Sequence, residues 1–98
     1  MNGTTYRETI VTFRGNLDEV TRHDIARTLQ DLERCHAVVI DLTQAETVDS
    51  NLLSELVAFK RRCVVRERPP SIQVRCHRRL ARLMQVAGLD ALFDMRCP

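Results

Sequence analysis

The stretch of this 98-residue sequence with the clearest chemical potential is Val48-Asp49-Ser50-Asn51-Leu52-Leu53. Asp and Ser are preferred at the first positions of a helix, because their side-chain oxygens accept hydrogen bonds from free backbone N–H groups. A serine at such a position is also suited to phosphorylation, since those N–H groups and the positive end of the helix dipole stabilise an added anion. The stretch therefore has two interpretations, a simple helix cap and a phosphorylated switch at Ser50.

The cysteines and histidines offer weaker chemistry. Cys35-His36 and Cys76-His77 suggest zinc ligands, but their spacing fits no zinc-finger pattern, and each pair belongs to a different end of a predicted strand. Cys35 and Cys63 could approach each other, which leaves a redox protein as a remote alternative. No nucleophile accompanies a histidine and no glycine-rich phosphate loop is present, so the sequence predicts no enzyme, no metal and no cofactor.

Strand-like and helix-like segments alternate along the chain and would position these residues. Apolar, β-branched runs predict strands at residues 9–13, 37–42 and 71–76, and residues 4–7 could add a short edge strand. Apolar residues spaced by three and four predict three helices. The predicted helices run from an N-cap at Thr21 to about Arg34, from Asp49 or Ser50 to about Val64, and from Arg78 to Ala87, with Gly88 after the last.

The helical spacing also predicts which side chains face the core. In the first helix these are Ile25, Leu29 and Leu32. The second helix is traced by Leu52, Leu53, Leu56, Val57, Lys60 and Val64, without a separate prediction of its core face. In the third helix the side chains expected to face the core are Leu80, Leu83, Met84 and Ala87. The β–α–β–α–β–α order predicts one α/β domain over residues 1–98 with right-handed crossovers.

Composition narrows the possible partners. Aromatic residues make up 4% of the chain, which leaves little material for an aromatic-lined nucleotide site. The net charge is +2, and the basic stretches at 60–62, 66–68 and 75–82 are best explained as solvated helix ends and loops, so no nucleic-acid partner is expected. Without a secretory leader or an apolar run of about 20 residues, the chain is expected to be cytoplasmic, with reduced thiols and no membrane insertion.

Several motifs together resemble the STAS family, to which bacterial anti-sigma factor antagonists belong. Val38-Val39-Ile40-Asp41-Leu42-Thr43, followed by the Asp49-Ser50 segment, is similar to the central signature of that family. Phe13-Arg14-Gly15-Asn16-Leu17-Asp18 resembles the family's strand ending in Gly-Glu-Leu-Asp, and Ala87-Gly88-Leu89-Asp90 with Leu92-Phe93 resembles its tail. The resemblance implies a small domain with a central mixed sheet of about four to five strands and helices packed mainly on one face.

Two residues depart from the antagonist pattern of Asp-Ser-Ser/Thr-Gly-Leu. Asn51 stands where many antagonists carry a second hydroxyl residue, and Leu52 replaces the glycine. Asp49-Ser50-Asn51-Leu52 is closer to the stressosome-scaffold variant, in which the phosphate acceptor directly follows the aspartate.

The resemblance implies a non-catalytic interaction domain that binds an anti-sigma factor with serine kinase activity, under control by phosphorylation of Ser50. The alternative is an unphosphorylated accessory or scaffold subunit, either in an assembly with other STAS proteins or docked on the ATPase of a lipid-transport ABC complex. The partner-binding residues expected for either role are Asp18, Thr43, Asp49, Ser50, Asn51, Leu52 and Leu53.

Overall fold

Strands and helices alternate along residues 8–18 and 22–97, the part of the chain that this computed structural model describes. The elements are β1 (Glu8–Thr12), β2 (Gly15–Leu17), α1 (Arg22–Leu32), β3 (Ala37–Asp41), β4 (Ala45–Val48), α2 (Ser50–Val64), β5 (Ser71–Arg75), α3 (Arg78–Val86) and β6 (Asp94–Arg96). The predicted N-cap at Thr21 and the possible edge strand at 4–7 lie outside the described residues. The α/β class expected from the sequence is confirmed, and all three predicted helices form close to their expected bounds.

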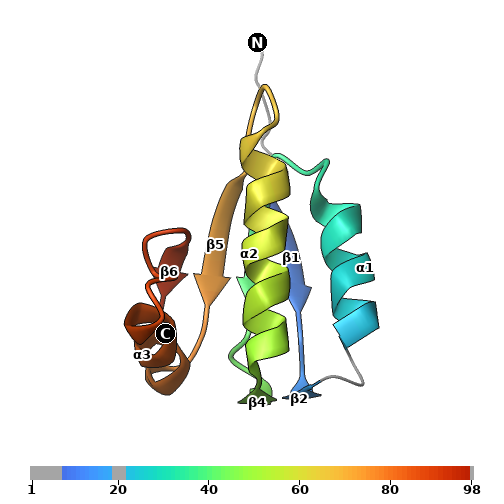
Figure 1. Cartoon of the computed structure of the whole chain (residues 1–98). Coiled ribbons are helices and arrows are strands. Elements are labelled where there is room, and N and C mark those ends of the chain that lie inside the picture. The colour runs from blue at the N-terminus through green and yellow to red at the C-terminus, as the bar shows by residue number, and fades with distance from the viewer. Residues whose placement is uncertain (1–7, 19–21, 98) are drawn as a thin grey trace.

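The main sheet has the strand order β1-β3-β5-β6, and each of its described pairs is parallel. A mixed sheet was expected, and in this respect the expectation differs from the described sheet. The reason lies in the connections: a helix separates each strand from the next one that pairs with it, so that the chain returns to the same edge before each strand begins. All four carboxyl ends therefore lie at one edge of the sheet, and the arrows of β1 and β5 point toward the lower part of Figure 1.

A second, two-stranded parallel sheet pairs β2 with β4 at that same edge (Figure 1). Gly15 has a φ of +74°, a value that favours glycine, and it begins β2 directly after the turn that follows β1. The polar residues at 43–47 are typical of a loop, yet Ala45–Val48 pairs with β2 and forms a strand. The small sheet carries the chain to the start of α2.

The helices cover one face of the main sheet, where α1 and α2 lie side by side in Figure 1. Strand residues that point to this face pack with the helices in one apolar cluster, as expected from the alternating pattern of β5. The buried cluster contains Leu17, Ile25, Leu29, Leu32, Val38, Ile40, Leu42, Leu52, Leu56, Phe59, Cys63, Ile72, Val74, Cys76, Leu80, Met84 and Phe93. Among the described residues, no helix is long and apolar enough to cross a membrane.

The predicted inward face is right for α1 and only partly right for α3, where Ala87 is exposed although it was expected to face the core. In α2 the buried face continues from Leu56 to Phe59 and Cys63, whereas Val64 is 50% exposed. In α3, Leu80 and Met84 are buried, but Leu83 is 55% exposed. Helix α3 lies at the side of the sheet (Figure 1), where it buries a narrower stripe than a helix over the centre.

Candidate functional site

The start of α2 is fixed by the side chain of Asp49. Its Oδ1 atom accepts hydrogen bonds from the backbone N–H groups of Asn51, at 2.9 Å, and Leu52, at 3.2 Å, and its Oδ2 atom accepts one from the Asn51 side-chain amide at 3.2 Å. The backbone N–H of Asp49 in turn donates to the Leu17 carbonyl at 3.2 Å. The cap expected from the sequence thus forms, and β2 holds it in place.

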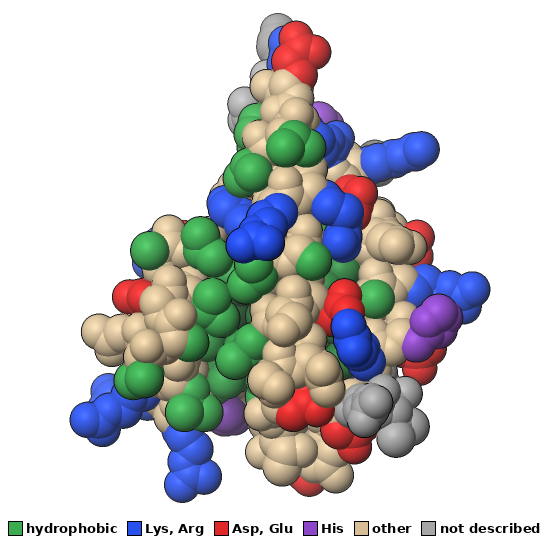
Figure 2. Space-filling view, viewed as in Figure 1, with side chains coloured by type: hydrophobic (Ala, Val, Ile, Leu, Met, Phe, Trp, Pro, Cys, Tyr) green, Lys and Arg blue, Asp and Glu red, His purple; other side chains and the backbone are tan. Residues whose placement is uncertain are grey.

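Ser50 is the first residue of α2, and its side chain is exposed. Asp18 directly follows Leu17, the residue hydrogen-bonded to the cap, and it is exposed as well. Acidic side chains gather around this lower end of α2 in Figure 2. The structure therefore brings Asp18, Asp49 and Ser50 to one place on the surface.

Two other predicted residues of this segment have different surroundings. The side chain of Leu52 is 1% exposed and belongs to the core, so it anchors the helix and a docked partner would not reach it in this conformation. Leu53 is half-buried and packs against the edge of the core cluster. Of these two leucines, only Leu53 can offer apolar surface to a partner.

A groove runs from Ser50 along α2 on the side that faces α3 and the turn after it. It encloses about 580 Å³, and Figure 2 shows hydrophobic side chains gathered between the two helices. The lining residues are Ser50, Leu53, Ser54, Val57, Ala58, Arg61, Arg62, Ala87 and Leu89. Arg61 gives the far end of the groove a positive charge, whereas the charge of Arg62 is paired with Glu33.

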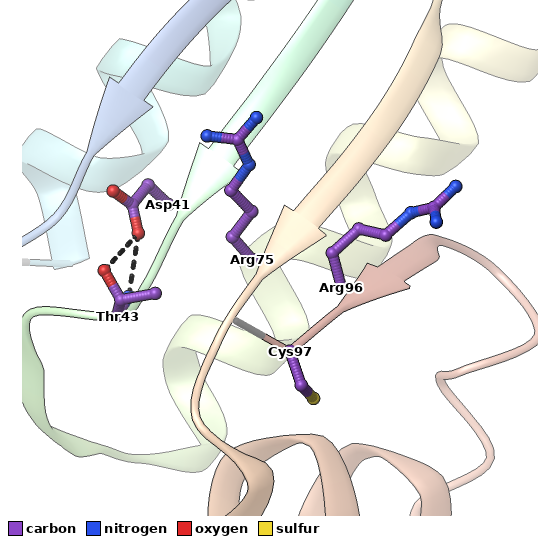
Figure 3. Close-up of a pocket in the computed structure, with 5 residues that line it drawn as sticks. All are labelled: Asp41, Thr43, Arg75, Arg96 and Cys97. Atoms are coloured by element: carbon purple, nitrogen blue, oxygen red, sulfur yellow. Dashed lines mark hydrogen bonds between the residues drawn. The ribbon is translucent and has the colours of Figure 1, made fainter.

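Thr43 occupies a separate hollow of about 320 Å³ at the carboxyl ends of β3, β5 and β6 (Figure 3). Its backbone N–H and its hydroxyl donate to Asp41 Oδ1, at 2.9 Å and 2.6 Å, and Thr12 donates to the other carboxylate oxygen at 3.5 Å. Burial raises the pKa of Asp41, but these hydrogen bonds and the charge of Arg75 outweigh it, so the pKa lies below its usual value. The residues lining this hollow are Asp41, Thr43, Arg75, Arg96 and Cys97.

The thiols show no metal-binding arrangement, because no group of three or more potential ligands occurs among the described residues. Cys35 precedes β3 and Cys76 follows β5, so they lie at opposite edges of the sheet, as expected. Burial and the nearby charge of Glu33 raise the pKa of the Cys63 thiol, with Arg66, Arg62 and Lys60 acting against this. At neutral pH a thiol with a raised pKa is mostly in its protonated form, which reacts slowly.

The comparisons with known proteins agree with this architecture. The family model described as "Mlab, STAS domain" matches residues 3–95. The chain is a STAS domain. A crystal structure of an anti-sigma factor antagonist from Mycobacterium paratuberculosis has a similar fold, with a TM-score of 0.78 and 23% sequence identity over 90% of this chain and 75% of that chain. No curated protein matches the chain.

The sequence of this STAS domain indicated the start of α2 but not the opposite side of the groove. Asp49, Ser50, Asn51 and Leu53 lie at the start of α2, and Asp18 follows Leu17, whose carbonyl accepts the hydrogen bond from Asp49; their role in binding a partner stays a prediction. The side of the groove formed by Ala87 and Leu89 was missed, because it depends on how α3 lies against α2. One signal in the sequence could have indicated this side of the groove: α3 contains more apolar residues than its buried pair, Leu80 and Met84.

Proposed function

We propose that this STAS domain is a non-catalytic regulatory module that binds a protein partner, an anti-sigma factor with serine kinase activity, through the start of α2. The observation that carries the proposal is the exposure of Ser50 at the first helical position, between the Asp49 cap and the apolar groove. A kinase can reach such a hydroxyl without unfolding the domain. A partner of this kind acts in the cytoplasm, which is where we place this domain.

Phosphorylation at Ser50 would change the charge of the docking surface rather than the fold. The modification adds about −1.5 to −2 charges, and the N-terminal end of α2 stabilises them through its dipole. The surface already presents the carboxylates of Asp18 and Asp49. A partner that presents acidic or apolar groups to Ser50 would be repelled, at a cost of about 3 kcal/mol, or about 100-fold in affinity.

The groove is a second reason to place the docking site at the start of α2. It begins at Ser50 and Leu53 and continues past Val57, so a partner that covers the hydroxyl can also bury apolar side chains. Arg61 at the far end would pair with an acidic group of the partner. Thr43 lines the other hollow rather than the groove. We propose that its hydrogen bond to Asp41 fixes the turn after β3.

The test begins with affinity capture of the tagged domain from host lysate, with mass analysis of both the bound proteins and the Ser50 peptide. Binding of the captured partner is then measured by calorimetry for the wild type and for Ser50→Ala and Ser50→Asp. We expect Ser50→Ala to bind within about 3-fold of the wild type and Ser50→Asp to bind about 100-fold more weakly.

A matched control makes the same charge change far from the site. Ser71→Asp alters an exposed serine at the opposite edge of the sheet, where β5 begins, and should leave binding unchanged. Equal affinity for Ser50→Ala and Ser50→Asp would overturn the switch. Equal weakening by Ser71→Asp would show a general charge effect and would also count against it.

An accessory or scaffold role is the second candidate, favoured by Asn51 and Leu52. Asn51 has no hydroxyl, and its amide is already bonded to Asp49, while Leu52 is committed to the core. In this role Ser50 stays unmodified, and the same surface contacts other STAS proteins or the ATPase of a lipid-transport ABC complex. Capture of such a partner with unmodified Ser50 would favour this role, and a stable monomer in sedimentation would argue against self-assembly.

A further inference from the structure

The pairing of β5 with β6 brings together two cysteines that lie far apart in the sequence. Arg75 pairs with Arg96 in the last register position of these strands. The backbone N–H of Cys76 then donates to the Arg96 carbonyl at 3.0 Å. In a parallel ladder, a residue that donates in this way faces the residue after the acceptor. Cys76 therefore faces Cys97 on the neighbouring strand.

The two side chains also lie on the same side of the sheet. Successive residues of a strand alternate between the faces, and Figure 3 shows the Arg96 side chain and the Cys97 thiol pointing in opposite directions, with Cys97 directed toward α3. Cys76 is fully buried in the core cluster on the helix-covered face. Burial raises the pKa of Cys76 to about 11, and the neighbouring Cys97 contributes to the shift, in agreement with the pairing of the two residues across the strands.

The distance between such neighbours suits a disulfide. Adjacent strands lie about 4.8 Å apart, and disulfides join residues whose Cα atoms are about 4.4–6.8 Å apart. Both cysteines directly follow the last residue of a short strand, and the hydrogen bond from Cys76 to Arg96 keeps them side by side. Small adjustments of the two χ1 angles can therefore bring the sulfur atoms together.

The two thiols differ in access. Cys76 is 0% exposed, whereas Cys97 is exposed and lines a second hollow together with Arg78 and Arg82 of α3. A reagent in solution can reach Cys97 and cannot reach Cys76. Asp90 also lines this hollow, and the two guanidinium groups outweigh its carboxylate, which favours the approach of an anionic reagent.

We propose that Cys76 and Cys97 are an oxidation-sensitive pair that forms a reversible intramolecular disulfide with a small anionic disulfide such as oxidised glutathione. The Cys97 sulfur attacks one sulfur of the reagent, forming a mixed disulfide and releasing one glutathione thiol. The Cys76 thiol then loses its proton and attacks the Cys97 sulfur, which releases the second glutathione. The protein is oxidised by two electrons, and the reagent takes up both electrons and both protons as two thiols.

The disulfide would close a ring that contains α3 and β6. Strand β6 has three residues and pairs with β5 alone among the described strands, so it is weakly held at the edge of the sheet. A covalent link beside it opposes its separation and restricts the unfolded chain. We expect oxidation to raise the melting temperature by on the order of 10 °C.

Peptide mapping of the wild-type chain tests the pair directly. The purified domain is treated with oxidised glutathione, free thiols are alkylated, and the protein is digested with trypsin. Cleavage after Arg75, Arg78 and Arg96 releases Cys76-His77-Arg78 and Cys97-Pro98, which the proposal expects as one disulfide-linked species that a reducing agent separates. The linked form should also show the higher melting temperature.

Variants separate this disulfide from the other cysteines. The double variant Cys35→Ser, Cys63→Ala should still form the linked species, and Cys97→Ser should not. The proposal is overturned if Cys97 carries glutathione while Cys76 remains free, if Cys97 links to a second copy, or if no linked species forms. None of these measurements involves a partner or Ser50, so their outcome is independent of the proposed function.

Discussion

Helix α2 lines one side of the groove directly, whereas α3 borders the other side through the residues that follow it, Ala87 and Leu89, and the two helices are held in different ways. Helix α2 has fifteen residues, four of them buried, and its first turn is closed by the Asp49 side chain. Helix α3 has nine residues and two buried ones, and its N-cap residue His77 makes no side-chain hydrogen bond to the helix. The comparison suggests a division of roles, in which α2 is the fixed wall of the groove and α3 the adjustable one.

The two helices also differ in where their exposed apolar residues lie. Leu83 and Val86 of α3 are 55% and 83% exposed, although the helix is rich enough in apolar residues to bury a wider stripe. In α2, the strongly exposed apolar residue Val64 lies at the far end, away from Ser50. A surface that is apolar and weakly anchored is typical of a docking face.

The largest expected effect tests whether α2 is anchored by burial. Leu56→Ala removes a side chain that is 0% exposed and should lower the free energy of unfolding by about 3 kcal/mol, because it leaves a cavity. The matched change Leu83→Ala in α3 should cost less than about 1 kcal/mol, since that side chain is mostly in water. Urea denaturation measures both. Equal losses would remove the distinction between the two helices.

A smaller effect is expected from the caps. Asp49→Ala deletes the acceptor for two backbone N–H groups and should cost about 1 kcal/mol, whereas Asp49→Asn retains a capping oxygen and should cost less. His77→Ala should be close to neutral, because His77 contributes no side-chain cap. Thermal melts of the three variants check this order. A larger loss for His77→Ala than for Asp49→Ala would contradict it.

The smallest effect concerns the ion pair between α1 and α2. Arg22 Nε lies 3.0 Å from Glu55 Oε1, and the two side chains are 50% and 15% exposed. Pairs open to solvent contribute little, so Glu55→Gln should lower stability by less than about 0.5 kcal/mol, and added salt should reduce the difference further. A loss comparable to that of Leu56→Ala would mean that charge, rather than burial, holds α2.

The sequence was most informative where one local pattern determines the structure. The apolar run at β3 and the Asp49 cap are such patterns, and both formed as predicted. Strands β2, β4 and β6 have three or four residues each and no run of apolar side chains, and they are strands because a neighbour pairs with them. The pairing of Cys76 with Cys97 depends on the register between β5 and β6, which α3 separates in the sequence, and no local pattern contains it.

The parallel pairing has a consequence for how fast the domain folds. No described strand reaches its partner through a hairpin, and even the shortest connection in the main sheet, between β5 and β6, contains the whole of α3. Each strand pair must therefore close a long loop before its hydrogen bonds form, which gives the chain a high contact order. The helices, which need only local contacts, are expected to form early and the sheet late, with β6 able to join only after α3 has turned the chain back.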